Sequence, residues 1–162
     1  MAKKSKGFKQ LLYEEQWHQS KSAAETALAK RFQQRWGSNH LVVPSAEGQV
    51  KLSEALETLV TPYLEEADAY EVSYGLFTMA VFGWNLALFP EESRAAEVEK
   101  AVALFAEQNS DPEYLEDTRA ILNELIERKR NLFPQLQRHI LDFELKENRR
   151  GKFFLSVVST PE

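Results

Sequence analysis

The first candidates for metal chemistry are Glu15 and His18, which lie three positions apart. On a helix this spacing places a carboxylate and an imidazole one turn apart, which is half of the ligand pattern of di-iron helical bundles. The sequence contains no second Glu-x-x-His, and neither His40 nor His139 follows a carboxylate at that spacing. We therefore interpret Glu15 and His18 as a solvated helix face and expect the histidines to hold no metal.

A second candidate is the densest acidic cluster of the chain, which lies near a predicted turn. Clustered carboxylates can bind a divalent cation or perform acid–base chemistry, and Arg128 or Lys129 would complete a carboxylate-based, metal-dependent enzyme. That alternative stays open. The spacing differs from that of a calcium-binding loop, so we favour a solvated helix end. The cluster consists of Glu65, Glu66, Asp68 and Glu71.

Several chemistries are excluded by what the chain lacks. It contains no cysteine, which removes disulfides, thiolate zinc sites, iron–sulfur clusters and cysteine nucleophiles, and makes a reducing cytoplasm the expected location. Glycine-rich phosphate loops and the Gly-x-Ser-x-Gly hydrolase turn are also absent. The leading interpretation therefore has no catalytic residues, no metal and no cofactor.

Charge is sorted along the chain. Residues 1–36 carry eight basic and three acidic side chains, residues 37–127 carry four and eighteen, and residues 128–162 carry eight and four. The local net charges are +5, −14 and +4, within a total of −5. Such segregation can steer a partner, or hold the basic ends of the chain against its acidic middle.

The basic segment 1–36, which we call the arm, is the strongest candidate for a contact surface. Its cations neighbour aromatic side chains, a combination that suits an anionic membrane surface or a nucleic acid. The acidic middle would repel a polyanion, so we favour self-docking of the arm or a protein partner over nucleic-acid binding, which stays an alternative. The candidate interaction residues are Lys3, Lys4, Lys6, Phe8, Trp17, Lys30, Arg31, Arg35 and Trp36.

Helical periodicity accounts for much of the chain. Apolar residues at three-and-four spacing predict one helix or two over residues 6–36, followed by a loop over residues 37–49. The next helix is expected to have Ser53 as its N-cap and to be kinked or ended by Pro62. The segment 69–89 is apolar on nearly every side, which is typical of a central buried helix. The polar residues within it argue against a membrane span.

Two further helices begin with the same signal, a proline followed by glutamate. Proline has no backbone N–H, but an N–H in the first turn of a helix has no partner within the helix, so nothing is lost there. Carboxylates are stabilised near the positive end of the helix dipole. Pro90 therefore predicts a helix to about Glu107, and Pro112 predicts another that ends before Pro134.

Near the C-terminus the apolar period changes from that of a helix to that of a strand. Leu141, Phe143 and Leu145 alternate with charged residues, and a second apolar run follows a turn that contains glycine. We therefore predict a β-hairpin over residues 139–159. The alternative is a helix over residues 135–147. An isolated hairpin is marginally stable in water, so this one must pack on other elements.

One part of the sequence resembles a known group of proteins. The block Trp84-Asn85-Leu86-Ala87-Leu88-Phe89-Pro90-Glu91-Glu92, followed by Arg128-Lys129-x-x-Leu132-Phe133-Pro134 and the hairpin, resembles small uncharacterised bacterial proteins of mostly helical build. The resemblance covers roughly residues 50–160 and implies no activity. In physical terms, Trp84 is expected to fill the core while its indole hydrogen and the Asn85 amide bond to backbone groups. We expect Trp84, Asn85 and Pro90 to be structural.

Taken together, these patterns predict a mostly α (α+β) fold of five or six helices, bundle-like, with a small C-terminal β-hairpin. The arm precedes a single domain over residues 37–162. We predict a non-enzymatic interaction or regulatory module of the bacterial cytoplasm. It would bind a protein partner or itself through the arm and the hairpin, without spanning a membrane.

Overall fold

The computed structural model describes residues 50–65, 67, 69–147 and 153–161, together with Leu28, Lys30, Arg31 and Gln34 of the arm, which are all helical. The helices predicted over residues 6–36 and the loop over residues 37–49 otherwise lie outside the described residues. The chain divides into two compact units. The helical unit is Ser45–Leu141 with Ser159–Glu162, and the arm–hairpin unit is Met1–Pro44 with Asp142–Val158.

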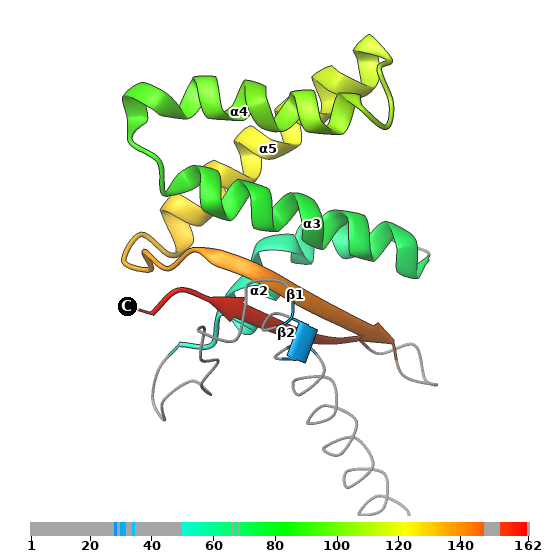
Figure 1. Ribbon diagram of the computed structural model, residues 1–162. Coiled ribbons are helices and arrows are strands. Elements are labelled where there is room, and N and C mark those ends of the chain that lie inside the picture. Colours follow the sequence, from blue (N-terminus) through cyan, green and yellow to red (C-terminus); the bar gives the residue numbers. More distant parts are fainter. Residues whose placement is uncertain are drawn as a thin grey trace, which may run out of the picture. The chain divides into compact units, whose positions relative to one another are not determined.

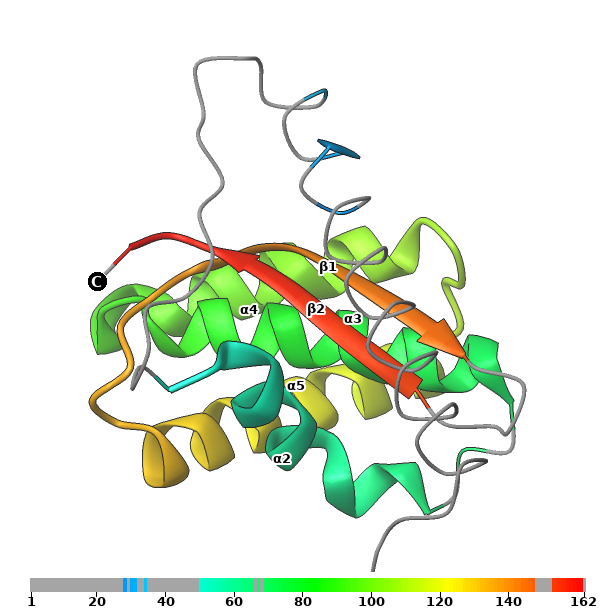
Figure 2. The same ribbon diagram turned by 90° about the horizontal axis from the view of Figure 1, so that it is seen from below.

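Helices dominate the described residues, as predicted. They are α2 (Leu52–Leu64), α3 (Tyr70–Ala87), α4 (Glu91–Ala106) and α5 (Pro112–Leu132) (Figure 1). Within the described part of the chain this makes four helices, so the predicted number of five or six is not matched there. α3 and α5 contact each other and both remaining helices, and they form the centre of the helical unit (Figure 2). No described helix is long and apolar enough to cross a membrane.

The start of α2 differs from the prediction. Its N-cap is Lys51, without a side-chain hydrogen bond, and Ser53 lies inside the first turn. The reason is that Leu52 is buried, and a helix that includes Leu52 places it on the same apolar face as Leu56 and Leu59. The predicted cap at Ser53 was therefore wrong by two residues.

The starts of α4 and α5 follow the predicted signals. Pro90 is the N-cap of α4, and its carbonyl accepts hydrogen bonds from the backbone N–H groups of Ser93 and Arg94. At α5 the Asp111 side chain accepts from the N–H of Glu113 at 3.0 Å. The Arg94 bond is the first i to i−4 bond of α4, whereas the Asp111 side chain satisfies an N–H that has no backbone partner in the first turn of α5.

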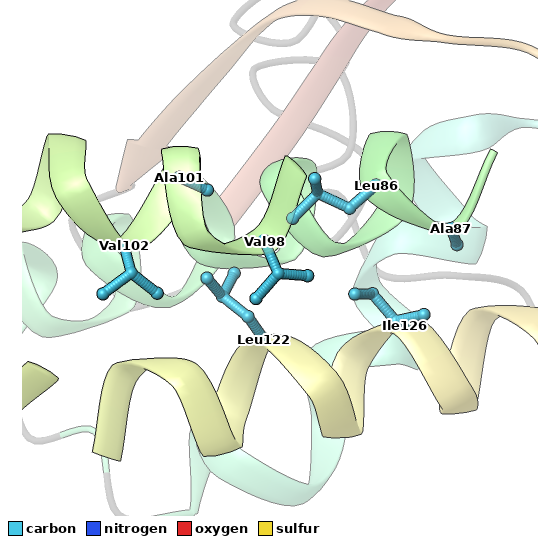
Figure 3. Close-up of a cluster of buried hydrophobic side chains, with 7 residues drawn as sticks. All are labelled: Leu86, Ala87, Val98, Ala101, Val102, Leu122 and Ile126. Carbon is cyan, nitrogen blue, oxygen red and sulfur yellow. The ribbon is translucent and has the colours of Figure 1, made fainter. Parts of the chain in front are cut away.

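An apolar cluster joins α3, α4 and α5. In Figure 3 the side chains of Val98 and Val102 on α4 point towards Leu122 on α5. The cluster buries side chains from all three helices, which explains why α3 is apolar on several sides. Its members are Leu86, Ala87, Val98, Ala101, Val102, Leu122 and Ile126.

α3 and α5 approach each other most closely at Gly83. A Cβ atom placed on Gly83 would lie 2.6 Å from the Cβ of Leu125, which is closer than side-chain carbons approach each other. The Cβ of Leu125 is fixed to its backbone and cannot swing aside. The absence of a side chain at residue 83 therefore sets the distance between the two central helices.

The C-terminal residues form the predicted hairpin. β1 (Ile140–Glu147) pairs with β2 (Phe153–Ser159) in a two-stranded antiparallel sheet. The alternative helix over residues 135–147 is therefore wrong. Phe143 and Leu145 are buried and Glu144 between them is not, which fits the alternation of a strand. Leu141 was expected on the same apolar side, but it is exposed, and Ile140 is buried instead.

We predict that Gly83→Ala lowers the free energy of unfolding by about 1–3 kcal/mol, because the added methyl group overpacks the contact with Leu125. Urea unfolding followed by circular dichroism measures the change. Gly75→Ala is the control on the same helix, since nothing lies within 4 Å of its added Cβ. It should stabilise the protein by about 0.5–1 kcal/mol through helix propensity. Equal stability of the two variants would contradict the close approach.

Candidate functional site

Two of the predicted interaction residues, Lys30 and Arg31, belong to the described part of the chain. Both are exposed, and they lie on helical backbone. The other predicted interaction residues lie outside the described residues: Lys3, Lys4, Lys6, Phe8, Trp17, Arg35 and Trp36. The geometry of the candidate surface is therefore built around Arg31.

The guanidinium of Arg31 binds three consecutive residues of β1. Its Nε and Nη2 donate to the two carboxylate oxygens of Asp142 at 3.2 and 3.0 Å. Its Nη1 donates to Glu144, and Nη2 also donates to the carbonyl of Phe143 at 2.7 Å. Asp142 and Glu144 are two positions apart on a strand, so both carboxylates lie on one face. The planar fork of arginine matches this arrangement.

The electrostatics of this contact favour the charged arginine. Burial opposes the charge of Arg31, but the hydrogen bonds and negative charges of Asp142 and Glu144 outweigh burial and raise the pKa of Arg31. The Asp142 carboxylate is also held from its own strand, because its Oδ1 accepts from the N–H of Phe143 at 2.9 Å. The acidic side of the contact is therefore oriented in part by β1 itself.

An apolar pair lies in the same arm–hairpin unit. Leu28 and Val158 form a buried cluster, with Leu28 only 2% exposed. Leu28 and Arg31 are three residues apart on helical backbone, so they share a helix face. We call this set of residues the arm contact: Leu28, Arg31, Asp142, Phe143, Glu144 and Val158.

A buried cation occupies the helical unit, at the last turn of α5. The side chain of Lys129 is 2% exposed, and its Nζ donates to the carbonyls of Phe133 at 3.0 Å and Leu136 at 2.6 Å. Nζ also lies 5.1 Å from the centre of the Trp84 ring, within the range of a cation–π interaction. Desolvation by burial lowers the pKa of Lys129.

The neighbouring pair Trp84 and Asn85 binds the segment that leads into β1. The fully buried Trp84 donates from its indole N–H to the carbonyl of Arg138 at 2.8 Å. The Asn85 amide donates to the carbonyl of Ile140 at 2.8 Å and accepts from the Ile140 N–H at 2.9 Å. Both side chains thus bond to backbone groups, as their residue types predicted. Together with Lys129 they hold the chain between α5 and β1.

Arg128 performs a separate structural task at α2. Pro62 lies inside this helix and lacks the N–H that would bond the carbonyl of Thr58. Arg128 donates to that carbonyl, and to the carbonyl of Leu59, at 3.2 Å each. The guanidinium thus supplies the donor that proline removes.

The residues considered for metal chemistry do not meet among the described residues. Glu65 and Glu71 are exposed, whereas Glu66 and Asp68 lie outside the described part, as do Glu15, His18 and His40. His139 is exposed. Across the described ranges, no group of three or more His, Asp or Glu residues is placed to hold a metal ion.

Comparison with known proteins identifies no relative. No family model, curated protein or solved structure matches the chain. The resemblance carried by the block that begins at Trp84 therefore stays a prediction.

We predict that the Lys129 ammonium makes stability depend on pH in the alkaline range. The pKa of Lys129 is lower in the folded chain than its ordinary value of 10.5, so the unfolded chain binds more protons between the two values. The free energy of unfolding of the wild type, relative to Lys129→Met, should therefore rise as pH increases towards about 10.5. Urea unfolding of both proteins at a series of pH values measures this difference, and a difference that falls or stays flat would contradict it.

A double-mutant cycle tests the role of Arg128. We predict that Arg128→Ala lowers the free energy of unfolding by about 1–2 kcal/mol in the wild type, because it leaves the Thr58 carbonyl without its donor. In a Pro62→Ala background the helix regains its own N–H, and the same substitution should cost about half as much or less. Identical losses in the two backgrounds would show that Arg128 does not compensate for the proline.

Proposed function

We propose that this protein is a non-enzymatic interaction or regulatory module of the cytoplasm. It binds a protein partner, or a second copy of itself, through the arm and the β-hairpin. The observation that carries the proposal is the arm contact, in which Leu28 and Arg31 of the arm meet the strands of the hairpin. This contact combines charge complementarity with a buried apolar side chain, as protein interfaces do.

The strength of the arm contact suits a reversible interaction. Burying a leucine side chain contributes about 1.5–3 kcal/mol, and an exposed ion pair contributes about 0.2–1 kcal/mol. The Arg31 side chain is 47% exposed, so its ion pairs belong to the weak class. A contact of a few kcal/mol forms readily and is exchanged readily when a competing surface is present.

The distribution of cations supports a protein partner over a nucleic acid. Arg31 is engaged by two carboxylates, which a phosphate would have to displace. Arg128 and Lys129, two of the C-terminal cations, donate to backbone carbonyls. Arg138 is likewise bound to the carbonyl of Thr160 and the hydroxyl of Ser159. Each of these described cations thus already has acceptors within the chain, which a phosphate would have to replace.

Charge reversal on the hairpin tests the proposed function. A partner is isolated with the tagged full-length chain and purified, and its binding is measured by isothermal titration calorimetry. Self-association is measured by light scattering. We predict that Asp142→Lys combined with Glu144→Lys weakens binding or self-association about tenfold or more, which corresponds to about 1.4 kcal/mol.

Glu147→Lys is the control, because Glu147 is an exposed carboxylate on the same strand and lies outside the arm contact. It should leave the measured affinity within about twofold of the wild-type value, given that exposed charges outside a contact have small effects. Circular dichroism establishes that each variant is folded. Unchanged binding and unchanged mass for the double variant would refute the proposed function.

A further inference from the structure

The arm contact presents one definite pattern for recognition. We infer that the carboxylates of β1 bind a basic amphipathic helix supplied by a partner protein, and that Leu28 and Arg31 occupy this surface until such a helix displaces them. The inference rests on the proposed function and deepens it, because it names the chemistry of the partner and gives the arm the role of the segment that the partner replaces on the hairpin. The pattern is a leucine and an arginine one helical turn apart.

Both residues of the pattern have a defined receptor. Leu28 is buried with Val158, which supplies the apolar part of the contact. Arg31 forms a fork with both oxygens of Asp142 and extends to Glu144 and to the carbonyl between them. A lysine has a single compact ammonium and cannot reproduce the fork. The surface therefore selects arginine at the charged position.

The acidic side of the contact is the more buried side. The Asp142 and Glu144 side chains are 13% and 22% exposed, against 47% for Arg31. Without a cation, two carboxylates on one face of a strand repel each other at short range. The strand thus favours a cation at this place whether the cation comes from the arm or from another protein.

The chemistry of the receptor defines which class of partner fits it. Two carboxylates and a carbonyl are hydrogen-bond acceptors, so they attract a cationic donor and repel phosphate groups. The neighbouring apolar contact at Val158 requires a side chain that reaches it from the same face as the cation. A basic amphipathic helix meets both requirements, since positions i and i+3 lie side by side on a helix.

The arm has an advantage over any partner because it is covalently linked to the surface. Such linkage raises the effective concentration of the arm, so a partner helix binds the wild type with an apparent affinity reduced by the fraction of time that the arm is bound. Releasing the arm should expose the surface. This relation between occupancy and affinity gives the inference a quantitative test.

The probe is a fluorescent peptide with the sequence of residues 22–36, whose anisotropy is followed as full-length protein is added up to about millimolar concentration, the range that a contact of a few kcal/mol requires. In the Arg31→Glu variant, the carboxylates of β1 repel the protein's own arm. If the arm occupies the surface about nine-tenths of the time, the peptide binds this variant about tenfold more tightly than it binds the wild type. Lys30→Glu is the matched control, because Lys30 is adjacent, exposed and without an ion pair to the described residues. That variant should bind the peptide as the wild type does.

Further variants locate the binding to the two carboxylates. Adding Asp142→Asn and Glu144→Gln to the Arg31→Glu protein removes the charges with little change of shape, and should abolish the gain in affinity. A peptide with lysine in place of its arginine should bind several-fold more weakly than the parent peptide. Circular dichroism of each full-length variant establishes that the fold is kept.

Three results would overturn the inference: no peptide binding to the Arg31→Glu variant, equal binding to this variant and the wild type, or binding that survives removal of both charges. A wild-type dimer that Arg31→Glu dissociates would assign the surface to a second copy and likewise overturn a separate helical partner. A purified partner that still depends on Asp142 and Glu144, while the peptide fails to bind, would leave the proposed function standing and refute only the helix chemistry.

Discussion

The helical unit depends on the close approach of its two central helices at Gly83 and Leu125. Trp84 follows Gly83 directly, and Lys129 lies one turn beyond Leu125, so the indole ring and the ammonium meet beside the point of closest approach. An ammonium removed from water requires hydrogen bonds in place of its hydration. Lys129 finds them in carbonyls just past the end of α5. The spacing of two helices thus decides where the chain runs after the second one ends.

Much of the fold follows from local signals in the sequence. Pro90 and Pro112 mark helix starts because a helix start needs no N–H from proline, and the alternation of Phe143 and Leu145 with charged residues identifies a strand. The prediction of Ser53 as N-cap was wrong because capping by Ser53 would leave Leu52 outside the helix, and the burial of Leu52 determines where the helix begins. α2 continues past Pro62, and Arg128 of α5 donates to the Thr58 carbonyl that the proline cannot bond. A local sequence pattern does not reveal such a contact between two helices.

The sites were less accessible to sequence reasoning. Trp84 and Asn85 were recognisable, since large polar-tipped side chains in an apolar helix need backbone partners. Lys129 was not, because its neighbours in the sequence are also cations and the triplet resembles an ordinary solvated helix end. The pairing of Arg31 with Asp142 joins residues more than a hundred positions apart. The sorting of charge did not indicate this pairing, because Asp142 and Glu144 lie in the C-terminal segment whose net charge is +4 and not in the acidic middle.

Asn85 offers Ile140 the same two groups that a neighbouring strand would offer, one acceptor and one donor. A side chain on a helix thereby takes the part of a strand at the residue where β1 begins. The N–H and C=O of a peptide group both need partners, and one amide supplies both. Ile140 therefore belongs to the helical unit, whereas the strand continues from Asp142 in the arm–hairpin unit.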